Sequence, residues 1–151
     1  MNFTNTIAHK NRIILKRFLT EISLDNLNKI PEGFSNNIIW NIAHIVVIQQ
    51  LLVYKLSGLP IHVSEEMVSK YRNKTKPEGD VTQDEVDEIN GLLESLLFQT
   101  EKDIIAGIFK TYTEYTVSLG TTLTNVQEAI EFNNFHEGVH LGYILALRKA
   151  I

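Results

Sequence analysis

The chain has 151 residues, no cysteine and a net charge of −4 at pH 7. A chain of this length fits a single domain, residues 1–151, whose core needs no disulfide. The lack of cysteine excludes disulfides, thiolate metal sites and cysteine nucleophiles. The 14 Lys and Arg residues form no cluster, so we expect no nucleic-acid partner, because phosphate recognition requires a basic face.

The most apolar stretch, residues 36–54, contains no Asp, Glu, Lys or Arg. Polar residues inside it include Asn41, His44, Gln49 and Gln50. Polar groups are costly at the depth of a membrane, so we predict a core helix of a soluble protein and no membrane contact. The first residues lack the basic patch and apolar run of a signal peptide, and the absence of disulfides fits a reducing compartment. We therefore expect a cytoplasmic protein.

The apolar spacing in the first part of the chain predicts two long helices. The first spans about residues 3–22, and its apolar positions are Ile7, Ile14, Phe18 and Ile22. The second spans about residues 35–57, after which Gly58 and Pro60 supply a stop.

A long connection, residues 59–80, separates these helices from the next one and holds one short helix at about 64–71. The third long helix opens at Thr82, where Glu85 is placed to complete a capping box. Its apolar stripe comprises Val86, Ile89, Leu93, Leu96, Ile104 and Ile108.

Residues 111–122 are rich in β-branched and aromatic side chains, which favour an irregular loop or a short strand pair. The last helix begins near Thr124, where Gln127 is placed to complete a second capping box, and it continues to the end. Four helices of this length predict an all-α fold, a four-helix bundle with up-down-up-down topology. The second and last long helices would then be parallel neighbours.

Two histidines of the last helix, His136 and His140, are four residues apart and lie on one face of it. Two imidazoles at this spacing can chelate one metal ion at about 2.0–2.1 Å. The alternative is that one caps a buried polar contact and the other is solvated. A third histidine, His44, lies in the charge-free centre of the second helix, so it is either a hydrogen-bonded core residue or a third ligand.

If the two helices are neighbours, the three histidines meet in one polar pocket. The residues on the same helix faces that we expect to line this substrate pocket are Asn37, Trp40, Asn41 and Asn133. Three neutral nitrogen ligands with a fourth position open to a pocket are the pattern of a catalytic zinc-type site. A closed site would instead be a structural staple. We predict that His9 and His62 are surface residues.

The run from His136 to His140 also matches the H-E-x-x-H pattern of zinc proteases. Those enzymes take their third ligand from downstream, but no His, Asp or Glu follows His140 here. The third ligand is therefore expected upstream, and the protease mechanism does not transfer. Glu137 is rotated by about 100° from His136, so we predict that it lies at the margin of the pocket or faces solvent.

Two segments, residues 40–45 (WNIAHI) and 135–144 (FHEGVHLGYI), resemble the two signature helices of the DinB-like proteins, which are metal-binding four-helix bundles. The resemblance places the histidine triad of that family on His44, His136 and His140. It implies one divalent metal ion, zinc or nickel, and a homodimer. The family includes S-transferases that use mycothiol or bacillithiol, alongside members without an assigned activity.

A three-histidine site is compatible with two classes of function. The first is an enzyme: a metal-dependent transferase that takes a low-molecular-weight thiol as cosubstrate, because the chain has no cysteine, or a hydrolase that activates water. Either enzyme would act on a small-molecule substrate. The second is a non-catalytic, dimeric metal-binding protein. An open fourth coordination position favours the enzyme, and a closed one favours the staple.

The second helix also predicts a homodimer, because two opposite faces of it are apolar. If the face with His44 packs in the core, the face with Ile42, Val46 and Val53 would be left for a partner. The alternative is that the connection 59–80 covers that face within one chain. A second candidate interface is a stripe of small residues on the last helix, namely Gly138, Gly142 and Ala146.

Overall fold

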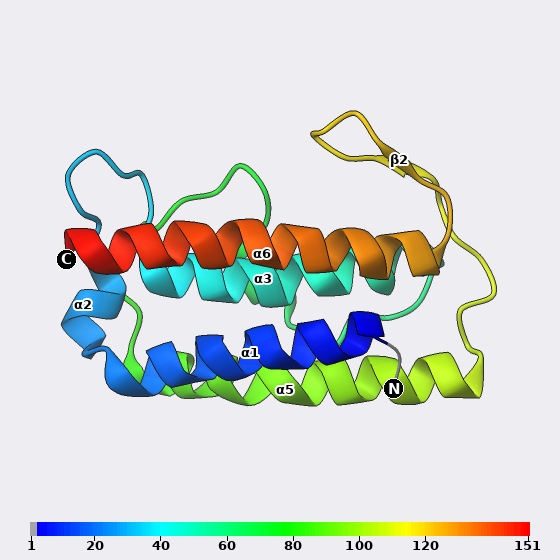
Figure 1. Ribbon diagram of the computed structural model, residues 1–151, viewed down its shortest axis with the longest axis horizontal. Helices are drawn as coiled ribbons and strands as arrows, with labels where there is room; N and C mark the ends of the chain where they lie inside the picture. The colour runs from blue at the N-terminus through cyan, green and yellow to red at the C-terminus, as the bar shows by residue number, and fades with distance from the viewer. Residues whose placement is uncertain (1–2) are drawn as a thin grey trace.

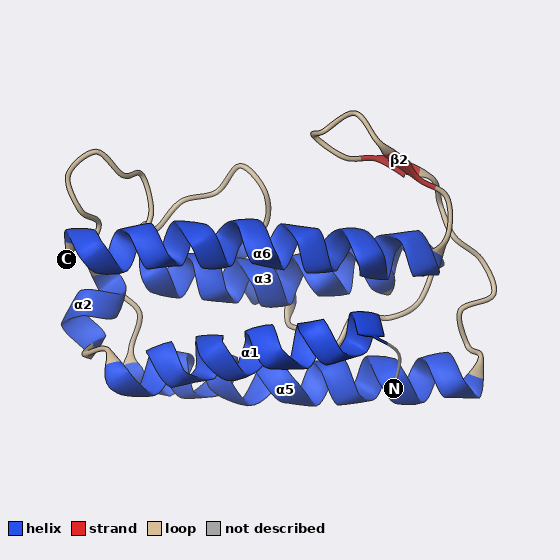
Figure 2. Cartoon of the chain, in the orientation of Figure 1, coloured by secondary structure: helices blue, strands red, loops and turns tan. Residues whose placement is uncertain are grey.

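The computed structural model describes residues 3–151, and the chain is mostly helical (Figures 1 and 2). The helices are α1 (Phe3–Glu21), α2 (Leu24–Asn28), α3 (Ile38–Val53), α4 (Glu65–Tyr71), α5 (Gln83–Ala106) and α6 (Val126–Ala150), with a 3-10 helix η1 (Lys55–Ser57) after α3. Two short strands, β1 (Tyr115–Thr116) and β2 (Thr122–Leu123), pair antiparallel between α5 and α6. The predicted all-α class is confirmed, and the stretch 111–122 holds a short strand pair.

The four long helices pack in two layers, with α3 beside α6 and α1 beside α5 (Figure 1). Hydrogen bonds between the two layers show in which direction each helix runs. Thr4 and Arg12 of α1 bond to Asn134 and Glu137 of α6, in the same order along both helices. The helices α1 and α6 therefore run parallel, from right to left in Figure 1.

The helices α3 and α5 run parallel to each other and opposite to α1 and α6 (Figure 1). Gln49 donates to Thr100 at 2.8 Å, and Tyr54 donates to Asp103 at 2.6 Å. The predicted up-down-up-down order is thus wrong, and α3 and α6 are antiparallel neighbours. The reason is the connection between α3 and α5, residues 54–82, which is long enough to carry the chain back along the bundle before α5 begins.

The helix α3 is the centre of the fold, and 15 of its 16 residues are buried. Its side chains pack against the other long helices and against α4, whose Met67 and Tyr71 belong to the same core cluster. Val46, expected on a free apolar face, is 0% exposed. The connection between α3 and α5 therefore covers this helix within one chain, and the predicted dimer face on α3 does not exist.

The segment Ile38–Ser57 is the only one within residues 3–151 that is long and apolar enough to cross a membrane. Of its most apolar window, 89% is buried inside the protein, as in the core helix of a soluble protein. Its buried amides are hydrogen-bonded: Gln50 donates to Gln49 and accepts from the backbone N–H of His62.

Two asparagines determine where the site-bearing helices begin. Asn37 caps α3, and Asn125 caps α6 through the backbone N–H of Glu128. The second helix therefore begins later than predicted. In place of the capping box expected at Thr124 and Gln127, Asn125 caps the last helix and the backbone N–H of Thr124 donates to Glu128 at 2.7 Å. Short polar side chains compete for the cap position, and tertiary packing decides which of them takes it.

Candidate metal centre

Three histidines from two antiparallel helices meet at the interface of α3 and α6. His44 comes from α3, and His136 and His140 come from successive turns of α6. One ring nitrogen of each lies within 4.8 Å of the other two. The ring centroids are 4.5 to 5.2 Å apart. The structure thus brings together the three histidines expected from the sequence.

Neighbouring oxygen atoms orient two of the three rings. His44 Nδ1 lies 2.6 Å from the carbonyl oxygen of Tyr71, and His140 Nδ1 lies 2.8 Å from Asn41 Oδ1. Because both oxygens are acceptors, Nδ1 carries the proton in each ring and Nε2 is left with a free lone pair. The Asn41 amide is itself held by two donations from Nδ2, at 2.8 and 2.7 Å. Metal-binding histidines are commonly oriented by such acceptors.

Burial keeps the three imidazoles neutral. It lowers the pKa of His44, against the opposing effect of the hydrogen bond to the Tyr71 carbonyl. Burial is also the main cause that lowers the pKa values of His136 and His140, each to about 3, with smaller effects from the neighbouring histidines. A metal binds the neutral form of imidazole, so protons compete only weakly for these nitrogens.

The donor set fits a divalent metal ion. His136 Nδ1 is buried and has no hydrogen-bond partner among the described residues, which indicates a group that the side chains do not supply. Two further nitrogens, Nε2 of His44 and of His140, carry free lone pairs. Three imidazole nitrogens with a fourth ligand from outside the protein are a known ligand set of zinc.

The cluster opens into a pocket of about 410 Å³. The pocket is lined by α3 and α6, by the loop after α4 and by the tip of the β1–β2 hairpin. Trp40 stacks on His44 within it, with centroids 4.7 Å apart and an interplanar angle of 14°. An accessible space beside three nitrogen ligands is typical of a catalytic metal site rather than of a structural one.

The comparison with known families agrees with this geometry. The model of the DinB superfamily matches residues 8–144, which is most of the chain. The chain belongs to the DinB superfamily. A comparison with curated proteins found no match to this DinB protein, so its activity has to be inferred from the site itself.

Three of the four residues predicted to line the substrate pocket of this DinB protein lie on α3 or at its start. Trp40 lines the pocket. Asn41 is fully buried and outside the pocket lining, where its Oδ1 accepts from His140 Nδ1. Asn37 does not reach the pocket, because its side chain caps α3: Oδ1 accepts from the backbone N–H of Trp40 at 2.9 Å, and Nδ2 donates to the carbonyl of Asn28 at 2.8 Å. The helical wheel predicted the correct face of α3, but the helix begins later than predicted, so Asn37 caps it instead of lining the pocket.

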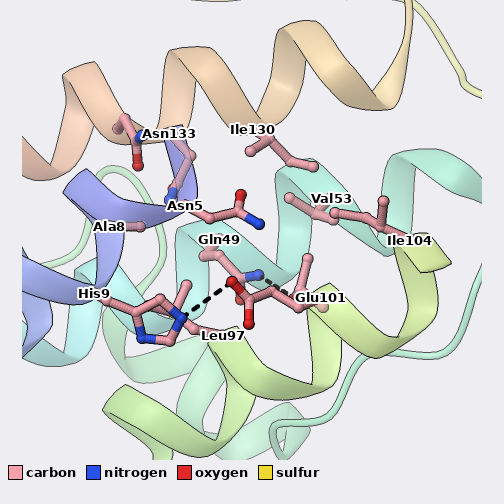
Figure 3. A pocket seen from close by; sticks show the side chains of 12 residues that line it. Asn5, Ala8, His9, Gln49, Val53, Leu97, Glu101, Ile104, Ile130 and Asn133 are labelled. Atoms are coloured by element: carbon pink, nitrogen blue, oxygen red, sulfur yellow. Dashed lines mark hydrogen bonds and ion pairs between the residues drawn. The ribbon is translucent and has the colours of Figure 1, made fainter. Parts of the chain in front are cut away.

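The fourth predicted residue, Asn133, lines a different cavity, of about 30 Å³, inside the bundle (Figure 3). Gln49 and Val53 of α3 lie across that cavity. Asn133 Nδ2 donates to Glu137 at 2.8 Å, and no described residue bonds to its Oδ1. Asn133 is about 60° from His136 around α6, which is enough to turn it away from the histidine pocket.

The two remaining histidines of the DinB protein are outside the metal cluster. His62 is exposed, as predicted. His9 is not a free surface residue: its side chain is 15% exposed, and its Nε2 lies 3.2 Å from a carboxylate oxygen of Glu101 at the cavity of Figure 3.

The site also contains a buried ion pair that the sequence analysis missed. Glu137, between the two ligands of α6, is 1% exposed and lies 2.6 Å from Arg12 of α1, which is equally buried. Asn11 and Asn133 each donate to Glu137 at 2.8 Å. The prediction that Glu137 lies at the pocket margin or in solvent is therefore wrong.

A signal for this pair was present in the first helix. Arg12 lies on the helix face formed by Ala8, Leu15 and Leu19, which are all buried. Of the predicted stripe, Phe18 is buried and Ile14 and Ile22 pack against the core, whereas Ile7 is 44% exposed. A lone arginine among buried positions of a helix requires an acidic partner, and Glu137 is that partner.

Proposed function

We propose that this protein is a metal-dependent S-transferase that joins a low-molecular-weight thiol to a small electrophile. The observation that carries the proposal is the open pocket beside His44, His136 and His140 in a chain without cysteine. Membership of the DinB superfamily and the imidazole donor set support one divalent ion, for which we propose zinc or nickel. We propose a cytoplasmic setting, where small thiols remain reduced.

The ion, when bound, would lower the pKa of a thiol in the open position and so make a nucleophile near neutral pH. The chain contributes the orientation of the ligands, through Asn41 and the carbonyl of Tyr71. Trp40 covers one face of His44 and lines the space for the substrate. In the net reaction a carbon–sulfur bond forms, the leaving group departs with its electron pair, and the thiol proton passes to solvent.

The first prediction tests the ion and the reaction together. After reconstitution with zinc or nickel, we expect about one ion per chain by elemental analysis, and conjugation of 1-chloro-2,4-dinitrobenzene only when both the ion and a small thiol are present. His140→Ala should lose the ion and the activity, because two imidazoles hold an ion far less tightly than three. His62→Ala is the matched control, since it removes an exposed histidine outside the cluster.

Two outcomes would contradict the transferase. Substrate turnover that is equal with and without added thiol would favour a hydrolase, because water can occupy the same open position. An ion that binds but supports neither reaction would favour a non-catalytic metal-binding protein. A reconstituted protein without any metal would reject the site itself.

A further inference from the structure

The pocket beside the three histidines has a single charged side chain. Among the described residues that line it, Lys74 is the only Asp, Glu, Lys or Arg. Large apolar side chains border the same pocket: Leu119, Phe135 and Val139 are 64%, 53% and 53% exposed. Exposed apolar side chains around a pocket indicate a ligand with an apolar body, and one polar group among them sets its orientation.

The backbone at Lys74 is in an unfavourable conformation. Lys74 has a φ of 66° and is the only non-glycine residue within 3–151 with a positive φ. Thr75 holds this turn, because its Oγ1 lies 2.8 Å from the carbonyl oxygens of both Lys70 and Arg72 and shares its one O–H donor between them. A left-handed lysine held by specific hydrogen bonds indicates that the placement of its side chain matters.

The turn that carries Lys74 is tied to the metal centre. Tyr71, the last residue of α4, offers the carbonyl that accepts from His44 Nδ1. The Tyr71 side chain is buried, and its hydroxyl donates to Glu85 at the start of α5. Lys74 follows three residues later, so one anchored segment both orients a ligand histidine and presents a cation to the pocket.

We propose that this pocket takes an amphiphilic anion, a small molecule with an apolar body and a carboxylate, and that Lys74 binds the carboxylate. The inference rests on the proposed function, because it names the substrate class of the same pocket. Leu119 and Phe135 would contact the apolar body. Partly exposed ion pairs of this kind contribute a preference of about five-fold for the charged ligand over a neutral one.

Trp40 offers a direct test, because it is the only tryptophan of the chain and lines the pocket. Its fluorescence would be followed while 4-phenylbutyrate or the uncharged 4-phenylbutanol is added to zinc-loaded and to metal-free protein. In the metal-free protein, where no open metal position competes for the carboxylate, we expect the carboxylate to bind about five-fold more tightly than the alcohol. Lys74→Gln should give the two probes the same Kd and leave the Kd of the alcohol unchanged.

Lys76→Gln is the matched control, because it removes the same charge two residues further on, from an exposed side chain outside the pocket lining. A preference that survives Lys74→Gln would place the carboxylate elsewhere and overturn the proposal. An equal loss in Lys76→Gln would show general attraction by the protein charge and would also overturn it. So would the absence of saturable binding of either probe.

The same preparations separate this proposal from the proposed reaction. Metal content and thiol conjugation are measured on them independently of Trp40 fluorescence. Lys74-dependent binding without conjugation would keep the anion site and reject the transferase. Thiol conjugation together with a carboxylate preference that does not depend on Lys74 would support the transferase and reject the anion site.

Discussion

Asn41 connects the backbone of α3 to the metal centre. Its oxygen accepts from His140 Nδ1, and its Nδ2 donates to two oxygens at the start of α3. The residue is 0% exposed, so neither role can be taken over easily by solvent. At the scale of single residues, the orientation of a candidate metal ligand is thus decided by a side chain outside the histidine cluster.

The second prediction concerns this residue. Asn41→Leu should lower zinc affinity by about 10- to 100-fold, because His140 loses the acceptor that orients its ring. Asn41→Asp retains an acceptor in the same place and should stay within a few-fold of the original affinity. Competition with a coloured chelator measures both variants. Equal affinities in the two variants would show that the hydrogen bond to His140 does not matter.

The buried ion pair of Arg12 and Glu137 lies beside the histidine cluster, because Glu137 lies between His136 and His140 in α6. Its charges are fully desolvated, so each depends on the other and on the surrounding donors. Arg12 also donates to the carbonyl of Leu93 in α5 at 3.2 Å. One arginine therefore connects α1, α5 and α6 at the level of the metal centre.

The third prediction is that Arg12→Met lowers the free energy of unfolding by about 3–5 kcal/mol, because Glu137 remains as a buried, unpaired charge. The double variant Arg12→Met, Glu137→Leu should lose less than the sum of the two single variants. Urea unfolding followed by circular dichroism gives these values. Lys16→Met, which removes the partly exposed partner of Glu94, is the control and should cost less than about 1 kcal/mol. Strictly additive losses would refute coupling in the pair.

At the scale of elements, α3 and α6 differ in how they are covered. The helix α3 is enclosed within one chain, whereas α6 keeps an outer face that is apolar between its terminal charges. Leu145 on that face is 44% exposed, and a Cβ added at Gly138 or Gly142 would meet nothing within 4 Å apart from the adjoining backbone and chain neighbours in α6. Small residues there would let a second helix approach closely.

The fourth prediction is a homodimer through this face of α6. We propose that light scattering will show twice the chain mass of 17.2 kDa at micromolar concentration. Gly142→Glu should halve the mass without unfolding the chain, because the new side chain points into open space. Gly91→Glu, at an equally open position on α5, should leave the dimer intact. A monomeric wild-type protein would remove the basis of this proposal.

At the scale of the whole molecule, the long connection between α3 and α5 builds the site. It covers α3, supplies the Tyr71 carbonyl to His44 and brings Lys74 to the pocket. The hairpin between α5 and α6 lines the same pocket with Ser118 and Leu119. The two longest connections of the fold are therefore parts of the candidate site, while the helices α3 and α6 carry its three histidines.

The fifth prediction is that acid destabilises the metal-free protein. The pKa values of His136 and His140 are about 3 in the folded chain, against about 6.5 when unfolded, so the unfolded state binds more protons between these values. The contribution of these histidines to the free energy of unfolding should be fully present above about pH 6.5. It should fall as the pH is lowered toward 3, by at most about 1.4 kcal/mol per pH unit for each histidine.

Urea unfolding at several pH values measures this slope. The double variant His136→Gln, His140→Gln should show a shallower loss of stability than the wild type over the same interval, and His62→Gln should match the wild type. Bound zinc should shift the loss to lower pH, because the ion competes with protons for the ring nitrogens. An unchanged slope in the double variant would exclude these histidines as its source.

The sequence by itself determined the helical class, the burial of the helix face that carries His44 and the three candidate ligands. These features depend on local periodicity: the charge-free run around His44 predicts a buried helix, and the spacing of His136 and His140 places both on one face. The short helix α4 was likewise visible as a local pattern, whereas residues 111–122 were compatible with either a loop or a strand pair. None of this required knowledge of which helices touch.

Only the tertiary structure decided the directions of the helices and the partners of the polar residues. Whether an asparagine caps a helix, as Asn37 does, or holds a ligand, as Asn41 does, depends on where the helix begins and what packs beside it. The ion pair of Arg12 and Glu137 joins residues 125 positions apart. Such contacts follow from the return of the chain through the connection between α3 and α5, and helical periodicity carries no information about that path.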